Sequence, residues 1–170
     1  TGGGTYASGA QVTVSATANS GYAFTSWSGA CSGLLSCADT MDSSKTVTAN
    51  FTQQFTLTTV ESPSTGGTVA PAGSTTHYSG SQMTVTVSVA GGSTFTGWSG
   101  ACSGTGSCLV TMDSNKTVTA NFDQQFTLTT VAEPSTGGTV SPGGISSYDS
   151  GSRVTVTATA ASGYSFGKWT

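Results

Sequence analysis

Two repeated cysteine pairs are the residues whose type and spacing point most directly to chemistry. Cys31 and Cys37 enclose five residues of a Gly/Ser-rich loop. Cys102 and Cys108 enclose five residues at the equivalent place, 71 positions later. A local pair that recurs in this way indicates one disulfide in each unit, which would contribute about 2 kcal/mol by loop closure. Free thiols and a metal site are the alternatives, but zinc sites usually space neighbouring ligands by about two to four residues.

The recurring charged residues offer little catalytic chemistry. Asp42 and Lys45 share one short turn, and Asp113 and Lys116 repeat it. An acid and a base of this kind lack a third group to orient them, so we expect ordinary turn residues. The one histidine, His77, does not recur. We therefore expect neither an enzyme nor a bound cofactor nor a metal.

Three tryptophans, Trp27, Trp98 and Trp169, recur with the same period and allow two interpretations. Each follows a phenylalanine and precedes the cysteine loop or its expected place. The favoured interpretation is a side chain packed on the disulfide, with its N–H bonded to a carbonyl. The second is an exposed platform that stacks on sugar rings, with avidity supplied by the array. Two N-glycosylation sequons, at Asn50 and Asn115, occupy different repeat positions and are expected to be coincidental.

These residues are positioned by a tandem repeat. Residues 1–54 align with residues 72–125 without a gap, and 32 of the 54 positions are identical. The sequence predicts a partial unit over 1–54, a complete unit over 55–125 and a partial unit over 126–170. Because the first unit lacks 17 opening residues and the third stops before its cysteines, we expect a segment of a longer array.

Each unit is predicted to be all-β, with about six short strands. Apolar and polar residues alternate most clearly at Val12, Val14, Ala16 and Ala18, and the copies repeat this at 83–89 and 154–160. Further strands are expected near residues 55–57, 67–69, 94–98, 109–112 and 118–122. Turn-forming Gly, Ser, Pro and Asn separate them, and residues 112–116 have the length of a hairpin loop. No window has the periodicity of a long helix.

Composition narrows the classes of partner. The chain has 170 residues with four Lys and Arg, seven Asp and Glu, and 61 Ser and Thr. So few basic residues do not favour nucleic acid or anionic lipid, and no apolar run is long enough to insert in a membrane. Disulfides in such a chain predict a secreted or cell-surface protein.

The blocks W-S-G-A-C-S-G, T-M-D and K-T-V-T-A-N-F, present in two copies, resemble the divergent internalin-type B-repeat family of bacterial surface proteins. The resemblance covers essentially the whole chain. It implies tandem stalk or spacer modules, a β-grasp-like fold and no catalytic residues. This sequence lacks a segment for the long helix of the better-known relatives.

We therefore expect a non-catalytic structural segment of a larger extracellular protein, whose partners are the neighbouring repeats. It would act as a stalk or, through self-association of exposed strand edges, as the building block of a filament. The competing hypothesis is an adhesin that binds glycans or a host surface through the recurring aromatic residues.

Overall fold

A computed structural model describes residues 3–170. The described residues are 55% strand and contain no helix, which confirms the all-β prediction. The strands are β1 (Gln11–Val14), β2 (Tyr22–Gly29), β3 (Cys37–Thr40), β4 (Val47–Ser62), β5 (Gly67–Ala70), β6 (Ser74–Tyr78), β7 (Gln82–Val89), β8 (Ser93–Gly100), β9 (Cys108–Thr111), β10 (Lys116–Thr130), β11 (Gly138–Ser141), β12 (Gly144–Asp149) and β13 (Thr157–Ala160). None of the described residues forms a helix that could cross a membrane.

The structure divides into two compact units, and each contains one joint between repeats. The first unit holds the residues up to Thr58 together with Ser74–Thr84 and Leu109–Thr117, and the second holds Thr59–Gly73, Val85–Cys108 and Val118–Thr170. The joint between the first and middle repeats, at Gln53 and Gln54, therefore lies in the first unit. The joint between the middle and third repeats, at Gln124 and Gln125, lies in the second.

The middle repeat, residues 55–125, is built from strands of two sheets. One sheet has the order β5-β7-β9, and the other contains β12-β10-β4-β2, with β6 paired to β4 and β8 to β10. The repeat thus uses β4 to β10, one strand more than expected. The additional strand is β6, which the sequence did not predict because its Thr-Thr-His-Tyr segment carries few large apolar residues.

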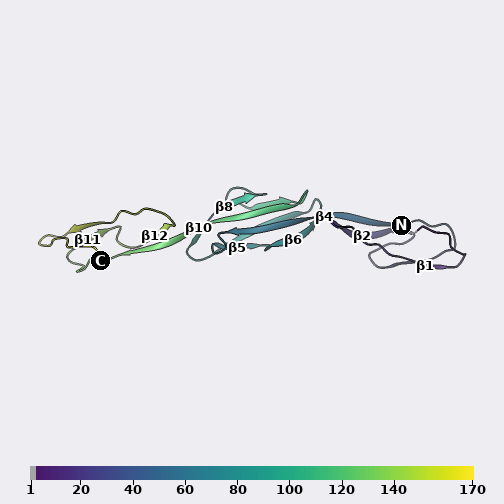
Figure 1. The fold of residues 1–170 in the computed structure, drawn as a ribbon, viewed down its shortest axis with the longest axis horizontal. Coiled ribbons are helices and arrows are strands. Elements are labelled where there is room, and N and C mark those ends of the chain that lie inside the picture. Colours follow the sequence, from purple (N-terminus) through teal and green to yellow (C-terminus); the bar gives the residue numbers. More distant parts are fainter. Residues whose placement is uncertain (1–2) are drawn as a thin grey trace. The chain divides into compact units, whose positions relative to one another are not determined.

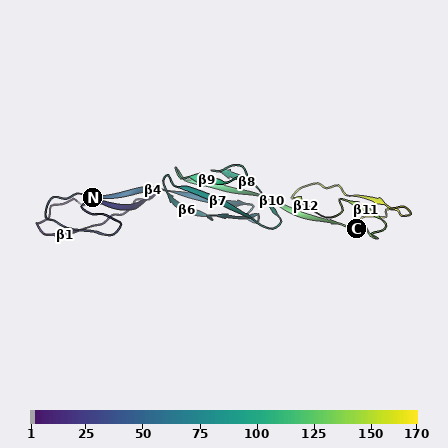
Figure 2. The ribbon, with the colours of Figure 1, turned by 180° about the vertical axis from the view of Figure 1, so that it is seen from behind.

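Continuous strands, and not loops, join the repeats. The first half of β4 pairs with β2, and its second half pairs with β6. At the changeover, the Gln54 amide donates to the Gly21 carbonyl at 2.7 Å, and the Ser79 amide donates to the Gln53 carbonyl at 2.8 Å. β10 repeats this arrangement with β8 and β12. Each of these two strands is drawn as one unbroken arrow in Figure 1 and, from behind, in Figure 2.

The strongest predicted strand is complete only in the middle repeat. There, Thr86–Val89 pair with β5, and β9 also pairs with β7. In the first repeat β1 ends at Val14, so the prediction was wrong for Ala16 and Ala18. In the third repeat β13 begins at Thr157, so it was also wrong for residues 154–156. Among the described residues the first repeat has no counterpart of β5, and the third has none of β9. A strand is therefore retained only where it has a partner.

The turn at residues 112–116 does not form the expected hairpin. It joins β9 to β10, which belong to different sheets. It is therefore a connection between sheets. A short turn rich in Asp, Ser and Asn serves either kind of connection, so the sequence could not distinguish them.

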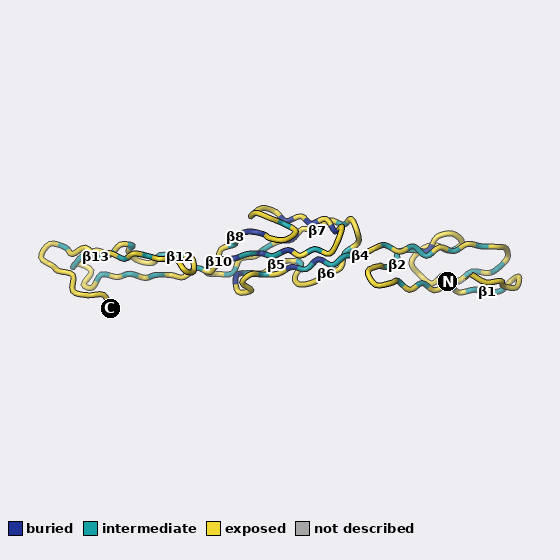
Figure 3. The backbone as a smooth tube through the Cα atoms, turned by 45° about the horizontal axis from the view of Figure 1, so that its top comes forward, coloured by how far each residue is buried: buried dark blue, intermediate teal, exposed yellow. Residues whose placement is uncertain are grey.

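Buried side chains concentrate in the middle repeat, as the dark blue segments of Figure 3 show. Phe122 of β10, 4% exposed, lies against Gly66 and Gly67 at the start of β5, so the two sheets are in contact at this point. The first repeat buries Trp27 and Cys37, whereas no apolar side chain in the described residues after Phe122 is buried. The other buried apolar residues are Leu57, Val69, Val85, Trp98, Cys108, Val110, Met112, Val118 and Ala120.

Candidate functional site

The predicted cysteine pairs are confirmed as disulfides. Cys31 bonds to Cys37 and Cys102 bonds to Cys108, with Cα atoms 5.7 and 5.6 Å apart. Both second cysteines are buried at the start of a strand, β3 or β9. Each disulfide therefore fixes to the core the loop between two strands that are consecutive in the chain, β2 and β3 or β8 and β9.

Trp27 and Trp98 hold the cysteine loops from the inside. Each side chain is only 6% exposed. The Trp98 indole N–H donates to the Gly106 carbonyl at 2.9 Å, and the Trp27 indole donates to the Leu35 carbonyl at 2.8 Å. Both indoles are thus packed and hydrogen-bonded, as the favoured interpretation predicts. They cannot serve as exposed platforms for sugars, whereas Trp169 is 53% exposed.

A β-bulge brings each tryptophan to the same face as the phenylalanine three residues before it. Residues three apart on a regular strand point to opposite faces. The pairing of β2 with β4 skips Thr25, which places Phe24 and Trp27 with ring centroids 5.0 Å apart. The pairing of β8 with β10 has the equivalent irregularity, and Phe95 and Trp98 are also 5.0 Å apart. The bulge therefore builds the aromatic cluster over the disulfide loop.

Asn50 and Asn121 fasten these bulges, a role that the sequence did not suggest. The Asn121 amide donates to the Gly97 carbonyl at 2.9 Å and to the Ser99 hydroxyl at 3.0 Å. The Asn50 amide makes equivalent bonds to Ser26 and Ser28. The recurrence of asparagine 71 residues apart was the available signal. Because the Asn50 amide is engaged in these bonds, the structure gives its sequon a packing role.

The charged turns form ion pairs between half-buried lysines and nearby carboxylates. Lys45 Nζ lies 3.0 Å from an Asp39 oxygen and 3.0 Å from an Asp42 oxygen, and Lys116 Nζ lies 2.6 Å from Asp113. Hydrogen bonds from these lysines lower the pKa of Asp42 and of Asp113. The hydrogen bonds that Lys45 donates to Asp39 and Asp42 raise the pKa of Lys45. Every shift favours the charged form of its group. Such pairs stabilise a turn and do not provide a neutral amine or a protonated acid for catalysis.

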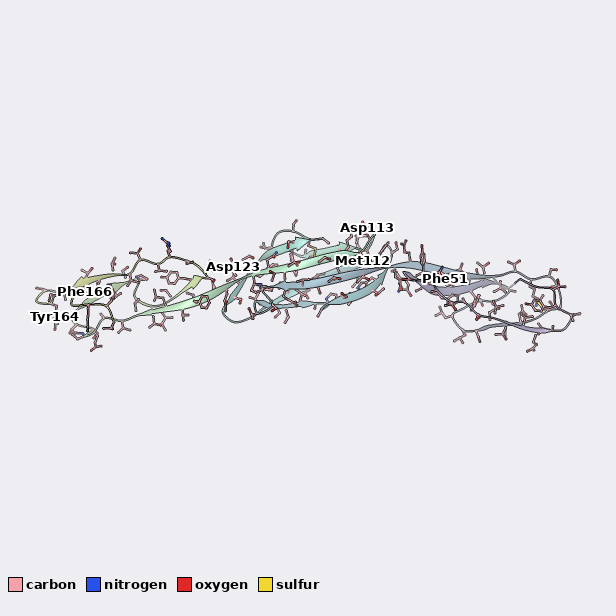
Figure 4. All side chains as sticks on the ribbon, in the orientation of Figure 1. Phe51, Met112, Asp113, Asp123, Tyr164 and Phe166 are labelled. Carbon is pink, nitrogen blue, oxygen red and sulfur yellow. A yellow bond between two sulfur atoms is a disulfide. The ribbon has the colours of Figure 1, made fainter. Side chains whose placement is uncertain are left out.

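Two exposed aromatic residues of the first repeat help to line a shallow hollow. It has a volume of about 230 Å³ and is lined by Thr17, Asn19, Tyr22 and Phe51. Tyr22 is 46% exposed and Phe51 is 41% exposed. Figure 4 marks Phe51 in this repeat. No cluster of three or more His, Cys, Asp or Glu residues suited to a metal occurs in the part of the chain that the structure describes.

We predict that removing one disulfide weakens one repeat. The double substitution Cys102→Ser/Cys108→Ser should lower the free energy of unfolding of the middle repeat by about 2 kcal/mol, since the short ring no longer restricts the unfolded chain. Hydrogen exchange read by mass spectrometry should show faster exchange in β8 and β9. The matched Cys31→Ser/Cys37→Ser variant should leave those strands unchanged; equal effects of both variants on β8 and β9 would contradict a local role.

Comparison with known families gives one match. The sequence model described as the divergent InlB B-repeat domain matches the chain three times, over residues 1–55, 56–126 and 128–170. Together the matches cover almost the entire sequence. Neither a curated protein nor a solved structure matches the chain.

Proposed function

The chain belongs to the divergent InlB B-repeat domain family, and from this premise we propose that it acts as a non-catalytic stalk segment of a larger extracellular protein. The family consists of extracellular repeat domains, which is consistent with a secreted or cell-surface location. In this role the array holds another part of the protein at a distance. Its partners are the neighbouring repeats.

The continuous strand at each joint carries the proposal. A flexible linker would leave the backbone between repeats free to rotate. Here Gln53 and Gln54 lie inside β4, which is hydrogen-bonded to β2 before the joint and to β6 after it. The backbone at the joint is thus fixed by two ladders. Resistance to bending at this point is what a spacer requires.

The surface supports an extracellular setting. Exposed hydroxyl side chains face one another across strands, as with Thr58 and Ser74, whose oxygens are 3.2 Å apart. Only four residues are Lys or Arg, so trypsin-like proteases have few cleavage sites. The disulfides suit an oxidising environment.

Electron microscopy of the unreduced protein tests the stalk. We expect particles with a narrow distribution of end-to-end lengths, which lengthen in proportion to the number of repeats. Gln54→Pro removes the amide that bonds to Gly21 and should broaden the distribution, because proline cannot continue the ladder. Gln54→Thr, which keeps the amide, is the matched control. Native particles as variable as the Gln54→Pro variant would refute the stalk.

A second version is a filament in which copies of this chain associate end to end. In the same images it would appear as long fibres with a regular axial repeat.

The alternative function is an adhesin for glycans or a host surface. The observation in its favour is that Tyr22 and Tyr78, 46% and 47% exposed, lie opposite Gln53 and Gln54 on the two edges of β4. Exposed rings at a joint could stack on sugars. Binding to a glycan array that is lost in the Tyr22→Ala/Tyr78→Ala variant would support this function.

A further inference from the structure

The two N-glycosylation motifs of the chain lie in different structural settings. Asn50 lies within β4, where the ladder with β2 pairs it directly with Ser26. Its Nδ2 donates to the Ser26 carbonyl, to the Ser26 hydroxyl at 3.2 Å and to the Ser28 hydroxyl at 3.0 Å. The nitrogen to which a glycan would be attached is therefore already engaged in hydrogen bonds within the sheet.

Asn115 lies in the exposed turn just before β10. Its Oδ1 accepts a hydrogen bond from the Thr56 amide at 2.8 Å, whereas its Nδ2 donates to no other atom among residues 3–170. The ladder of β10 with β8 begins only at Val118, so the whole motif, Asn115-Lys116-Thr117, precedes it. The bond with Thr56 thus fixes this side chain through its oxygen and leaves the nitrogen accessible.

The residues around Asn115 have the types that an oligosaccharyltransferase recognises. Thr117, the hydroxyl residue of the motif, is exposed. Asp113, two residues before the acceptor, is 68% exposed (Figure 4). It completes the longer motif D-x-N-x-T, in which bacterial transferases use the acidic residue as a further recognition point. The motif at Asn50 has Thr48 at this place. Sequence and structure therefore both favour Asn115 over Asn50.

We propose that Asn115 is an acceptor for N-linked glycosylation and that Asn50 is not. In the transfer, Nδ2 of Asn115 forms a bond to carbon 1 of the first sugar of an oligosaccharide carried on polyprenyl diphosphate. The bond from that carbon to the diphosphate oxygen breaks, the polyprenyl diphosphate leaves, and Nδ2 loses one proton. Because Oδ1 takes no part in the new bond, the glycosylated side chain can keep its bond with Thr56. This inference goes beyond the stalk and shares with it only the requirement for export.

A transfer assay with purified components tests the proposal. The unreduced chain is incubated with a bacterial oligosaccharyltransferase and an oligosaccharide linked to polyprenyl diphosphate, and the product is measured by intact mass spectrometry. We expect one glycan per chain, located on Asn115 by sequencing of chymotryptic peptides. A known acceptor peptide in the same reaction shows that the transferase is active. An unmodified chain, or a glycan on Asn50, would overturn the proposal.

Variants of the turn test the motif itself. Asn115→Gln should lose the glycan completely. Thr117→Val removes the hydroxyl but keeps Asn115 and its bond with Thr56, and it should also lose the glycan. Thr117→Ser is the matched control and should keep it, and Asp113→Asn should lose most of it. Equal transfer to the Thr117→Val and Thr117→Ser chains would contradict the assigned motif.

Two substitutions in the first repeat separate the structural argument from the sequence motif. Ser44→Asn completes the same five-residue motif in the exposed turn of Asp42 and Lys45, and it should give a second glycan. Thr48→Asp completes D-x-N-x-T around Asn50, whose amide is engaged in the sheet, and it should add none. A glycan on Asn50 of the Thr48→Asp chain, or none at position 44 of the Ser44→Asn chain, would contradict the proposal. These results depend neither on export nor on particle length, so electron microscopy judges the stalk separately.

Discussion

Replacing Trp98 by alanine is expected to destabilise the middle repeat by about 3–5 kcal/mol. The side chain is 6% exposed, its ring lies 5.0 Å from that of Phe95, and its N–H donates to the Gly106 carbonyl. The substitution would leave a cavity beneath the cysteine loop and an unpaired carbonyl within it. The lost packing and the lost hydrogen bond should both destabilise β8, β9 and β10.

Hydrogen exchange of β8, β9 and β10 measures this effect. Trp98→Phe keeps most of the packing and removes the donor, so it should cost about 1–2 kcal/mol. Trp169→Ala is the matched control at the same repeat position. Because its side chain is 53% exposed, this substitution should lower the free energy of unfolding by only about 0.5 kcal/mol. Similar changes from Trp98→Ala and Trp169→Ala would contradict the buried role of Trp98.

Truncation of the equivalent residues Phe122 and Phe51 to alanine should lower the free energy of unfolding by very different amounts. Phe122→Ala is expected to cost about 3–5 kcal/mol, because the ring fills the space beneath Gly66 and Gly67. Phe51→Ala removes the same side chain from a hollow that is open to solvent. We expect it to cost less than about 1.5 kcal/mol, mainly through the contact with Phe24 at 5.8 Å.

Urea denaturation followed by hydrogen exchange assigns each loss to its repeat. The middle repeat should lose protection in Phe122→Ala and keep it in Phe51→Ala. Equal losses in the two repeats would show that the glycine cover does not determine the energy of this position.

The features that sequence predicted well are those that repeat locally. The two disulfides followed from pairs six residues apart at a fixed phase, and the packed tryptophans followed from their place beside those pairs. The all-β fold followed from alternation in strands such as 82–89. In each case the residues that carry the information lie close together in the chain.

The features that sequence missed depend on partners far along the chain. The bulge that turns Phe95 and Trp98 to one face is held by Asn121, 24 residues from Gly97. β6 contains no large aliphatic side chain and is defined by its pairing with β4. Periodicity within one segment cannot report a ladder with another, so these elements could not be derived locally.

The shared strand at each joint also constrains how such an array can change during evolution. On β4, Val47 and Ala49 of the first repeat are half-buried, and Leu57 and Thr59 of the middle repeat are buried. All four positions are odd-numbered, so one alternation continues through both repeats. Loss or gain of a single residue at Gln53 or Gln54 would turn the opening strand of the next repeat inside out. A flexible loop between repeats could accommodate such an insertion or deletion without changing the next strand. A continuous strand cannot, so the change would reach the next repeat. Arrays of this kind should therefore grow by duplication of whole 71-residue periods; in this chain residues 1–54 align with residues 72–125 without a gap.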